Sequence, residues 1–221
     1  MEPDKDLYFM LRNAVDLFTR INNRLDVAGE ENIPEYGGAL VCPSHFNFSD
    51  PFFVASGVRN RILHFLAWHG IEEMALVGPV FKKVGVMHAI KESYGVAQDK
   101  QEAGQVLGDL EKLLRDGDLV VIFPEGAINH WISPFGNGLK EFKPGALRLA
   151  ARAGVPIIPV GLKGTRWVVP NIINFHDFGG PDEGFWIPAV LPVKVKVRFG
   201  APFDVDPAAA DDRAVAAKEA D

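Results

Sequence analysis

A histidine and an aspartate lie close together in the stretch Pro43–Pro51, with four residues between His45 and Asp50. The apolar run 39–42 before this stretch predicts a buried strand, and the apolar run 52–55 after it predicts the start of a helix. A carboxylate near a histidine can fix the tautomer of the ring and stabilise the imidazolium. We therefore predict that His45 is a general base and that Asp50 orients it.

This pair needs no serine or cysteine nucleophile if the substrate supplies its own hydroxyl, as in direct acyl or phosphoryl transfer. The oxyanion of an acyl transfer would need backbone N–H donors, which the helix start at Asp50 or the loop at Gly126 could supply. Cys42 lies in the apolar strand and is better explained as a small buried side chain than as a nucleophile. The alternative for His45 is a structural histidine that caps a loop.

Two other polar elements follow predicted strands. The segment Lys91–Ser93 comes after a strand over 84–89, and Phe123-Pro124-Glu125-Gly126 comes after a strand over 119–122. In open α/β sheets, ligands bind beyond the carboxyl ends of the strands. We therefore expect these elements and the His45–Asp50 pair to form one site.

An amphipathic helix is predicted over residues 7–26, because apolar residues recur at spacings of three and four. Its stripe consists of Leu7, Leu11, Ala14, Phe18, Ile21 and Leu25. One interpretation is that the stripe packs on the core of the protein. The other is that the helix lies in a lipid interface, with Arg12, Arg20 and Arg24 toward anionic headgroups.

Strand and helix patterns alternate through the rest of the chain, which predicts a single α/β domain with a largely parallel sheet flanked by helices. The predicted strands are 39–42, 61–67, 84–89, 119–123 and 156–160. One predicted helix begins at Asp50–Pro51. The others cover 71–81, 99–115 and 144–153, and the last of these ends at Gly154.

The alternation of valines and cations over 193–199 predicts an edge strand with one wet face. We divide the chain into an N-terminal amphipathic segment (1–30), a main domain (31–206) and a charged, frayed tail (207–221).

Composition excludes several classes of protein. The net charge of -6 argues against a nucleic-acid binder, and a single cysteine fits a reducing compartment. The acidic start does not resemble a signal peptide, and no apolar window is long enough to predict a spanning helix. The histidines lack the spacing of metal ligands, so no metal is expected.

Four ordered stretches resemble the motifs of the glycerolipid acyltransferase family, which includes the lysophosphatidic-acid acyltransferases. They are His45 to Asp50, Gly85-Val86-Met87, Phe123 to Gly126, and Val155 to Val160. The segment that starts at Phe142-Lys143-Pro144-Gly145-Ala146 is also similar, so the resemblance covers roughly residues 30–165.

The resemblance implies acyl transfer from acyl-CoA or acyl-carrier protein to a hydroxyl of a lipid acceptor, with no other cofactor. It implies that His45 and Asp50 are catalytic. The acceptor would be bound by Phe123, Pro124, Glu125, Gly126 and Lys91. Members of the family act at membranes, so we expect peripheral attachment at the cytoplasmic face.

The chain departs from the family pattern after Gly126, where Ala127-Ile128-Asn129 replaces the usual Thr-Arg-Ser. Ile128 thus stands where an arginine would bind the phosphate of the acceptor, which makes a neutral or differently charged acceptor plausible. Four residues downstream are candidate replacements: His130, Trp131, Lys140 and Lys143. Two alternatives to an acyltransferase stay open, a non-catalytic lipid-binding relative and a hydrolase that uses the same pair.

Overall fold

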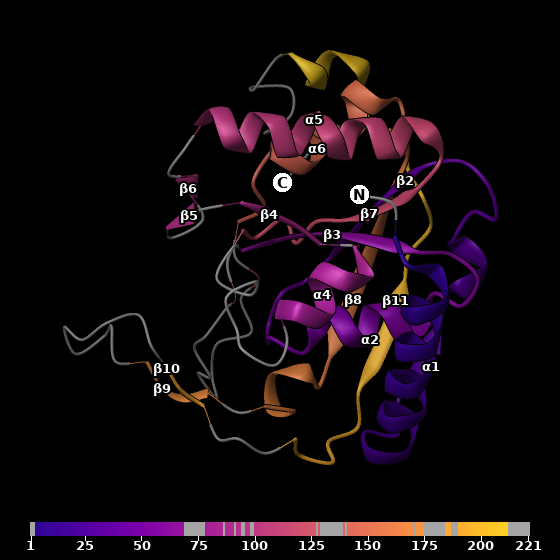
Figure 1. Ribbon diagram of the computed structural model, residues 1–221, viewed down its shortest axis with the longest axis vertical. Helices are drawn as coiled ribbons and strands as arrows, with labels where there is room; N and C mark the ends of the chain where they lie inside the picture. Colours follow the sequence, from indigo (N-terminus) through magenta and orange to yellow (C-terminus); the bar gives the residue numbers. More distant parts are fainter. Residues whose placement is uncertain are drawn as a thin grey trace.

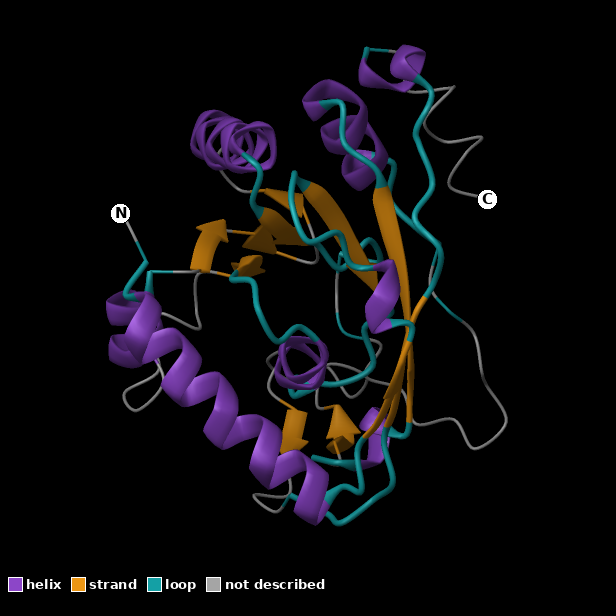
Figure 2. Ribbon diagram, turned by 90° about the vertical axis from the view of Figure 1, so that its right-hand side faces the viewer, coloured by secondary structure: helices purple, strands orange, loops and turns teal. Residues whose placement is uncertain are grey.

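The computed structural model shows a central sheet with helices on both faces (Figures 1 and 2). It describes residues 3–68, 78–85, 87–90, 92–93, 96–97, 100–126, 128, 139, 141–169, 171–174, 184–186 and 190–211.

Seven strands in the described residues form the main sheet, in the order β1-β11-β8-β2-β7-β3-β4. All neighbouring strands are parallel except β11 and β8. The predicted α/β class and largely parallel sheet are therefore confirmed. The strands are β1 (Asp26–Ala28), β2 (Ala39–Pro43), β3 (Leu63–Trp68), β4 (Met87–Ile90), β7 (Leu119–Val121), β8 (Ile157–Lys163) and β11 (Lys196–Phe199).

Two short antiparallel pairs lie outside the main sheet, β5 (Glu92–Ser93) with β6 (Val96–Ala97) and β9 (Asn171–Asn174) with β10 (Gly184–Trp186). Three 3₁₀ turns complete the described elements: η1 (Glu30–Asn32), η2 (Thr165–Trp167) and η4 (Pro207–Ala210).

The helices cover both faces of the sheet (Figure 2). α5 (Lys100–Asp116) and α6 (Gly145–Ala153) lie on one face, and α1 (Lys5–Asn22), α2 (Asp50–Gly57) and α4 (Gly78–Val84) lie on the other. Alternate residues of β2 face these two layers: Val41 packs in the cluster with α2, and Leu40 in the cluster with α5 and α6. Burial on both faces explains why the strands read as uninterrupted apolar runs.

Some predicted boundaries are wrong for identifiable reasons. The strand predicted over 84–89 starts too early, because Val84 is the last residue of α4 and Gly85 ends that helix at a φ of 72°. The strand predicted over 193–199 is not an edge strand, because β11 lies between β8 and β1. The helix predicted over 7–26 ends too late, because α1 ends at Asn22 and residue 26 is the first of β1. A three-residue strand such as β1 is too short to show a period of its own.

Two further helix predictions agree with the structure. The helix over 144–153 is confirmed as α6, and Gly154 caps it by donating its N–H to Ala150 and Ala151. The helix over 99–115 agrees with α5. The first seven residues of the helix predicted over 71–81 lie outside the described residues, as does the tail after 211.

Helix α1 buries polar side chains against the protein and exposes several of its apolar ones. Tyr8, Arg12 and Thr19 are buried, whereas Leu17 and Ile21 are 62% and 73% exposed. At 100° per residue, the exposed apolar positions lie opposite the buried polar ones. The interpretation that the apolar stripe packs on the core is therefore wrong for Ile21 and Phe18, which is also exposed. It is confirmed for Leu7 and Leu11, which pack against a buried cluster that contains Tyr8.

Arg12 joins α1 to the end of α2. Its Nε and Nη2 donate to the carbonyls of Ala55 and Ser56 at 3.2 and 2.7 Å. These carbonyls belong to the last turn of α2, where a cation interacts favourably with the negative end of the helix dipole. Arg12 therefore does not point toward a lipid headgroup, as one interpretation of the sequence supposed.

Two histidines share a contact in the layer between the sheet and α5. His64 Nδ1 on β3 and His88 Nε2 on β4 are 3.2 Å apart. In the described part of the chain, no third side chain of a metal-binding type joins them. Burial lowers the pKa of both rings. The pKa of His88 falls to about 4, where the neighbouring His64 lowers it further and Asp109 acts in the opposite direction.

The lowered pKa values predict an acid-sensitive fold. An unfolded histidine titrates near a pKa of about 6.5, so between that pH and about 4 the unfolded chain binds protons that the native pair does not. The free energy of unfolding should therefore decrease as the pH is lowered through this window, by on the order of 1–2 kcal/mol because solvent screens these partly exposed rings. Urea unfolding at a series of pH values would measure it. The variant His88→Gln keeps a hydrogen-bonding side chain without a titrating group, and should show a shallower slope. An unchanged slope would contradict the assignment.

Candidate active site

The carboxyl ends of three adjacent parallel strands, β8, β2 and β7, meet at one edge of the sheet (Figure 1). The loop after β2 is tied to β8 by two hydrogen bonds. Ser44 donates its N–H to Val160 at 3.1 Å, and its Oγ accepts from the N–H of Leu162 at 3.2 Å. The side chains that follow β2 and β7 are therefore brought to the same edge, as the strand order requires.

His45 and Asp50 form a hydrogen-bonded pair at this edge. His45 Nδ1 lies 3.0 Å from Asp50 Oδ2, and the side chains are 15% and 0% exposed. A carboxylate oxygen can only accept, so the hydrogen lies on Nδ1 and Nε2 keeps its lone pair. The pair thus has the arrangement of a base and its orienting carboxylate.

Asp50 also shapes the loop that carries His45. Its Oδ2 accepts the backbone N–H groups of Phe46 at 2.6 Å and Asn47 at 2.7 Å. Asp50 is the first residue of α2, with Pro51 next to it, so the carboxylate lies at the positive end of the helix dipole. One oxygen therefore fixes both the ring of His45 and the backbone next to it.

The Phe123–Gly126 loop holds His45 from the other side. Glu125 is buried, and its Oε1 accepts the backbone N–H of His45 at 2.7 Å. The ring of Phe123 stacks on the imidazole, with centroids 4.0 Å apart and an angle of 24° between the planes. The two sequence elements therefore meet, although Glu125 contacts the histidine through its backbone and not through its ring.

Lys143 crosses the same loop. Its N–H donates to the carbonyl of Pro124 at 2.8 Å, and its side chain lies over Gly126. A Cβ on Gly126 would come within 2.5 Å of the Lys143 Nζ, and Gly126 has a φ of 68°. Glycine is therefore favoured at this position by its positive φ, and its lack of a side chain lets the end of the Lys143 side chain approach the backbone.

Arg166 is a residue that the sequence prediction missed. Its guanidinium carbon lies 4.9 Å from the centroid of Phe46, which follows His45 in the chain. The strand predicted over 156–160 ended three residues too early, since β8 runs to Lys163. Strand-end reasoning with the correct boundary would have pointed to the loop after Lys163, where Arg166 lies.

The expected oxyanion donors are already engaged. The N–H of Gly126 donates to the carbonyl of Phe123, and the N–H of Asp50 donates to the carbonyl of Asn47, each at 3.0 Å. These bonds close the two turns and direct the donors into the loops. The N–H groups of Gly126 and Asp50 themselves are therefore not free to act as oxyanion donors, and whether other N–H groups of these two elements do so stays a prediction.

Cys42 behaves as the small buried side chain that the sequence favoured. It packs against the hydrophobic cluster with α5 and α6, and burial raises the pKa of its thiol to about 12. The thiolate is the nucleophilic form, so a thiol with this pKa is unreactive at neutral pH.

Several predicted residues lie outside the described part of the chain. Lys91, predicted to bind the acceptor, is one of them, as are three of the four candidate replacements for the lost arginine, His130, Trp131 and Lys140. Their roles stay predictions. Ile128 is described and is half-buried.

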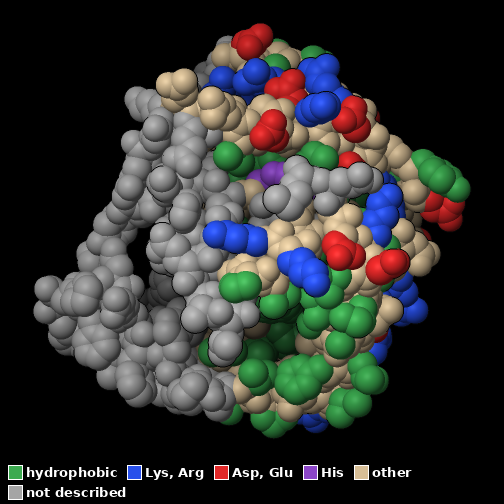
Figure 3. Space-filling model, in the orientation of Figure 1, with side chains coloured by type: hydrophobic (Ala, Val, Ile, Leu, Met, Phe, Trp, Pro, Cys, Tyr) green, Lys and Arg blue, Asp and Glu red, His purple; other side chains and the backbone are tan. Residues whose placement is uncertain are grey.

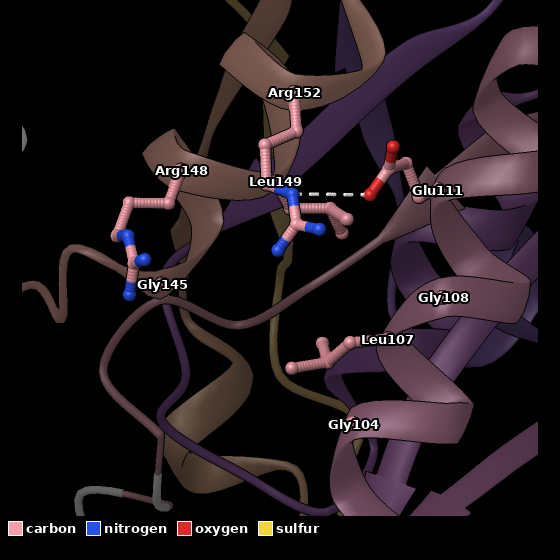
Figure 4. Close-up of a pocket in the computed structure, with 8 residues that line it drawn as sticks. All are labelled: Gly104, Leu107, Gly108, Glu111, Gly145, Arg148, Leu149 and Arg152. Atoms are coloured by element: carbon pink, nitrogen blue, oxygen red, sulfur yellow. Dashed lines mark ion pairs between the residues drawn. The ribbon is translucent and has the colours of Figure 1, made fainter. Parts of the chain in front are cut away.

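A concave region away from the His45–Asp50 pair lies between α5 and α6 (Figure 4). Its volume is about 160 Å³, and Arg152 Nε pairs with Glu111 Oε2 across it at 3.2 Å. Its lining contains none of the predicted site residues. The lining residues are Gly104, Leu107, Gly108, Glu111, Gly145, Arg148, Leu149 and Arg152.

Comparison with known proteins gives consistent matches. The family model described as acyltransferase matches residues 24–163. A 1-acyl-sn-glycerol-3-phosphate acyltransferase of Borreliella burgdorferi is 29% identical over 152 residues, which make up 68% of this chain and 56% of that protein. One of Bacillus subtilis is 23% identical over 158 residues, 72% of each chain. This chain thus matches little more than half of the length of the Borreliella relative.

The structure resembles a crystal structure of the 1-acyl-sn-glycerophosphate (LPA) acyltransferase PlsC from Thermotoga maritima. The TM-score is 0.66 at 20% sequence identity, over 100% of this chain and 79% of that chain. At this identity the likeness establishes the shared fold, an α/β domain with an N-terminal helix.

The contact between Glu125 and His45 leads to a test of stability. Replacement of Glu125 by alanine leaves the N–H of His45 without its acceptor, which should lower the free energy of unfolding by about 1–3 kcal/mol. Glu125→Gln keeps a side-chain oxygen and should cost less. Chemical denaturation measures both. Glu35→Ala removes an exposed glutamate and should change stability by less than about 0.5 kcal/mol. Equal effects of Glu125→Ala and Glu35→Ala would refute the structural role.

Proposed function

Because the chain belongs to the acyltransferase family, we propose that it transfers a fatty acyl group from a thioester donor to a hydroxyl of a lysolipid or a similar lipid acceptor. The donor is acyl-CoA or an acyl-carrier protein. The observation that carries this proposal is the His45–Asp50 pair, in which Nδ1 is held and Nε2 is left to take a proton. The names of the Borreliella and Bacillus relatives support a glycerolipid acceptor.

The reaction then proceeds without a covalent enzyme intermediate. His45 Nε2 removes the proton of the acceptor hydroxyl while its oxygen attacks the thioester carbonyl, and a C–O bond forms. The Asp50 carboxylate stabilises the imidazolium that results. When the tetrahedral intermediate collapses, the C–S bond breaks and the leaving sulfur takes the proton from His45, which yields an ester and a free thiol. The high pKa of Cys42 is consistent with this direct route.

Glu125 and the loop around it would then position the acceptor beside His45. The Glu125 carboxylate fixes the backbone of His45, and the Phe123 ring fixes its imidazole. An acceptor that lies along Phe123–Gly126 would present its hydroxyl to Nε2. We assign these residues to acceptor positioning, together with Pro124 and Lys91 from the sequence motifs.

The catalytic assignment predicts a large loss of transfer in His45→Ala. General-base catalysis contributes about 10²- to 10⁴-fold, so kcat should fall by roughly that factor. The measurement is acyl transfer from acyl-CoA to a panel of lysolipids, with folding checked by circular dichroism. His88→Gln changes a histidine outside the site and should retain activity. Transfer by His45→Ala at the wild-type rate would disprove the role of His45.

The same assay separates the remaining alternatives. A hydrolase would release thiol without an acylated lipid product, since water would replace the acceptor. A lipid-binding protein without activity would release no thiol with any acceptor.

We further propose that the outward face of α1 rests on a membrane surface at the cytoplasmic side. Exposed apolar side chains on this face include Met10, Leu17, Phe18 and Ile21, and Val80 of the neighbouring α4 is also exposed. Figure 3 shows hydrophobic side chains gathered over this region, with lysines and arginines beside them. An apolar helical face flanked by cations is typical of helices that lie in a lipid interface. Within the described residues, no helix is long and apolar enough to cross a bilayer.

This arrangement predicts a membrane affinity that depends on α1. The double variant Leu17→Glu and Ile21→Glu should lose most of its flotation with anionic liposomes, because each apolar side chain buried in lipid contributes about 1.5–3 kcal/mol. The single variant Leu107→Glu adds one negative charge to an exposed leucine of α5, in the opposite layer, and should float like the wild type, whereas Leu17→Glu alone should already weaken flotation. Failure of the wild type to float at low and high salt would overturn the proposal.

A further inference from the structure

The segment after the Phe123–Gly126 loop has no arginine at the position where the family resemblance led us to expect one. Ile128 stands at this position, two residues after Gly126. Isoleucine cannot bind an anionic group, so an anion at this loop would need another partner. Such a partner would be a cation that reaches this loop from another part of the chain.

Lys143 brings a cation to this loop from a segment seventeen positions beyond Gly126. An ideal Cβ on Gly126 would lie 2.5, 2.8 and 2.9 Å from its Nζ, Cε and Cδ atoms. The last three atoms of the side chain thus lie along the bare backbone of Gly126. The hydrogen bond from the Lys143 N–H to Pro124 holds the base of the side chain against the same loop.

The ammonium of Lys143 is close to the groups that hold His45. Gly126 is adjacent in sequence to Glu125, whose carboxylate binds the N–H of His45 at 2.7 Å. Lys143 is exposed, whereas Glu125 is buried. A ligand at the edge of the sheet would therefore reach the ammonium from solvent and still have its hydroxyl near His45.

We propose that Lys143 determines acceptor specificity by binding an anionic group, a phosphate or a carboxylate, close to the hydroxyl that is acylated. This inference rests on the proposed acyl transfer. A lysine offers a compact charge without the planar, bidentate fork of arginine. The site therefore selects acceptors for negative charge and is tolerant of the geometry of the anionic group.

The test compares two acceptors that differ only in charge, a 1-acylglycerol 3-phosphate and the monoacylglycerol with the same chain. The variant Lys143→Met keeps a long apolar stem without the ammonium. It should raise KM for the phosphate-bearing acceptor by about tenfold to a hundredfold and leave kcat and the monoacylglycerol reaction nearly unchanged. Lys143→Arg should restore most of the affinity. Lys112→Met removes an exposed lysine of α5 and serves as the matched control.

Both acceptors are assayed with acyl-CoA and with an acyl-pantetheine thioester that carries no phosphate. A defect that appears only with acyl-CoA would place the anion on the donor and overturn the proposal. An equal loss with both acceptors, or a change in kcat alone, would indicate a structural role for Lys143 and would also overturn it.

A binding measurement keeps this test independent of the proposed function. Calorimetry with glycerol 3-phosphate, the soluble headgroup, should show binding to the wild type that Lys143→Met weakens by a similar factor and Lys112→Met does not. If no thioester is consumed under any condition but this pattern holds, acyl transfer fails and the anion site stands. Equal binding by the wild type and Lys143→Met refutes the anion site.

Discussion

The hydrogen bonds to one oxygen of Asp50 set the geometry on which the site depends. Oδ2 receives the ring of His45 and two backbone N–H groups, whereas Oδ1 is buried without a hydrogen-bond partner among the described residues. If Asp50 bound only the imidazole, the loop would lack the two hydrogen bonds to its backbone. Because the same atom also holds the backbone of Phe46 and Asn47, the loop keeps the acceptor of the ring and the histidine in a fixed relative position.

The position of that oxygen depends in turn on helix α2, which is held at both ends. Asp50 begins α2 beside the edge of the sheet, and Arg12 of α1 binds the carbonyls at its other end. A negative group at the N-terminus and a positive group at the C-terminus both favour the helix dipole. The buried side of α1 thus helps to fix the helix that carries Asp50, whereas apolar side chains such as Leu17 and Ile21 stay exposed for another contact. If these side chains bind lipid, the membrane and the His45–Asp50 pair are joined through α2.

The sequence predicted those parts of the molecule whose signals are local. The apolar runs that are buried on both faces of the sheet identify β2, β7 and β8. The short loop between His45 and Asp50 brings these two side chains together. Two features have no local signal. Amphipathic spacing shows that α1 has two faces but not which one contacts the protein. Here Arg12 lies on the inner face, where it donates to carbonyls at the end of α2. The bond from His45 to Glu125 joins residues 80 positions apart, so only the strand order β2-β7 places them together.

The two tasks of the site are carried by different segments, and this separation has a physical consequence. The position of His45 is set by Asp50, Glu125 and Phe123, all of which contact its ring or its backbone. The cation at the loop comes from Lys143, in the segment before α6, which touches the loop at Pro124 and Gly126. A change in the charge that is recognised, such as isoleucine for arginine at position 128, therefore need not disturb the hydrogen bonds that orient the base. Under the proposed mechanism, proton transfer could stay constant while the acceptor changes, because Lys143 makes none of the hydrogen bonds that hold Nδ1 of His45 against Oδ2 of Asp50.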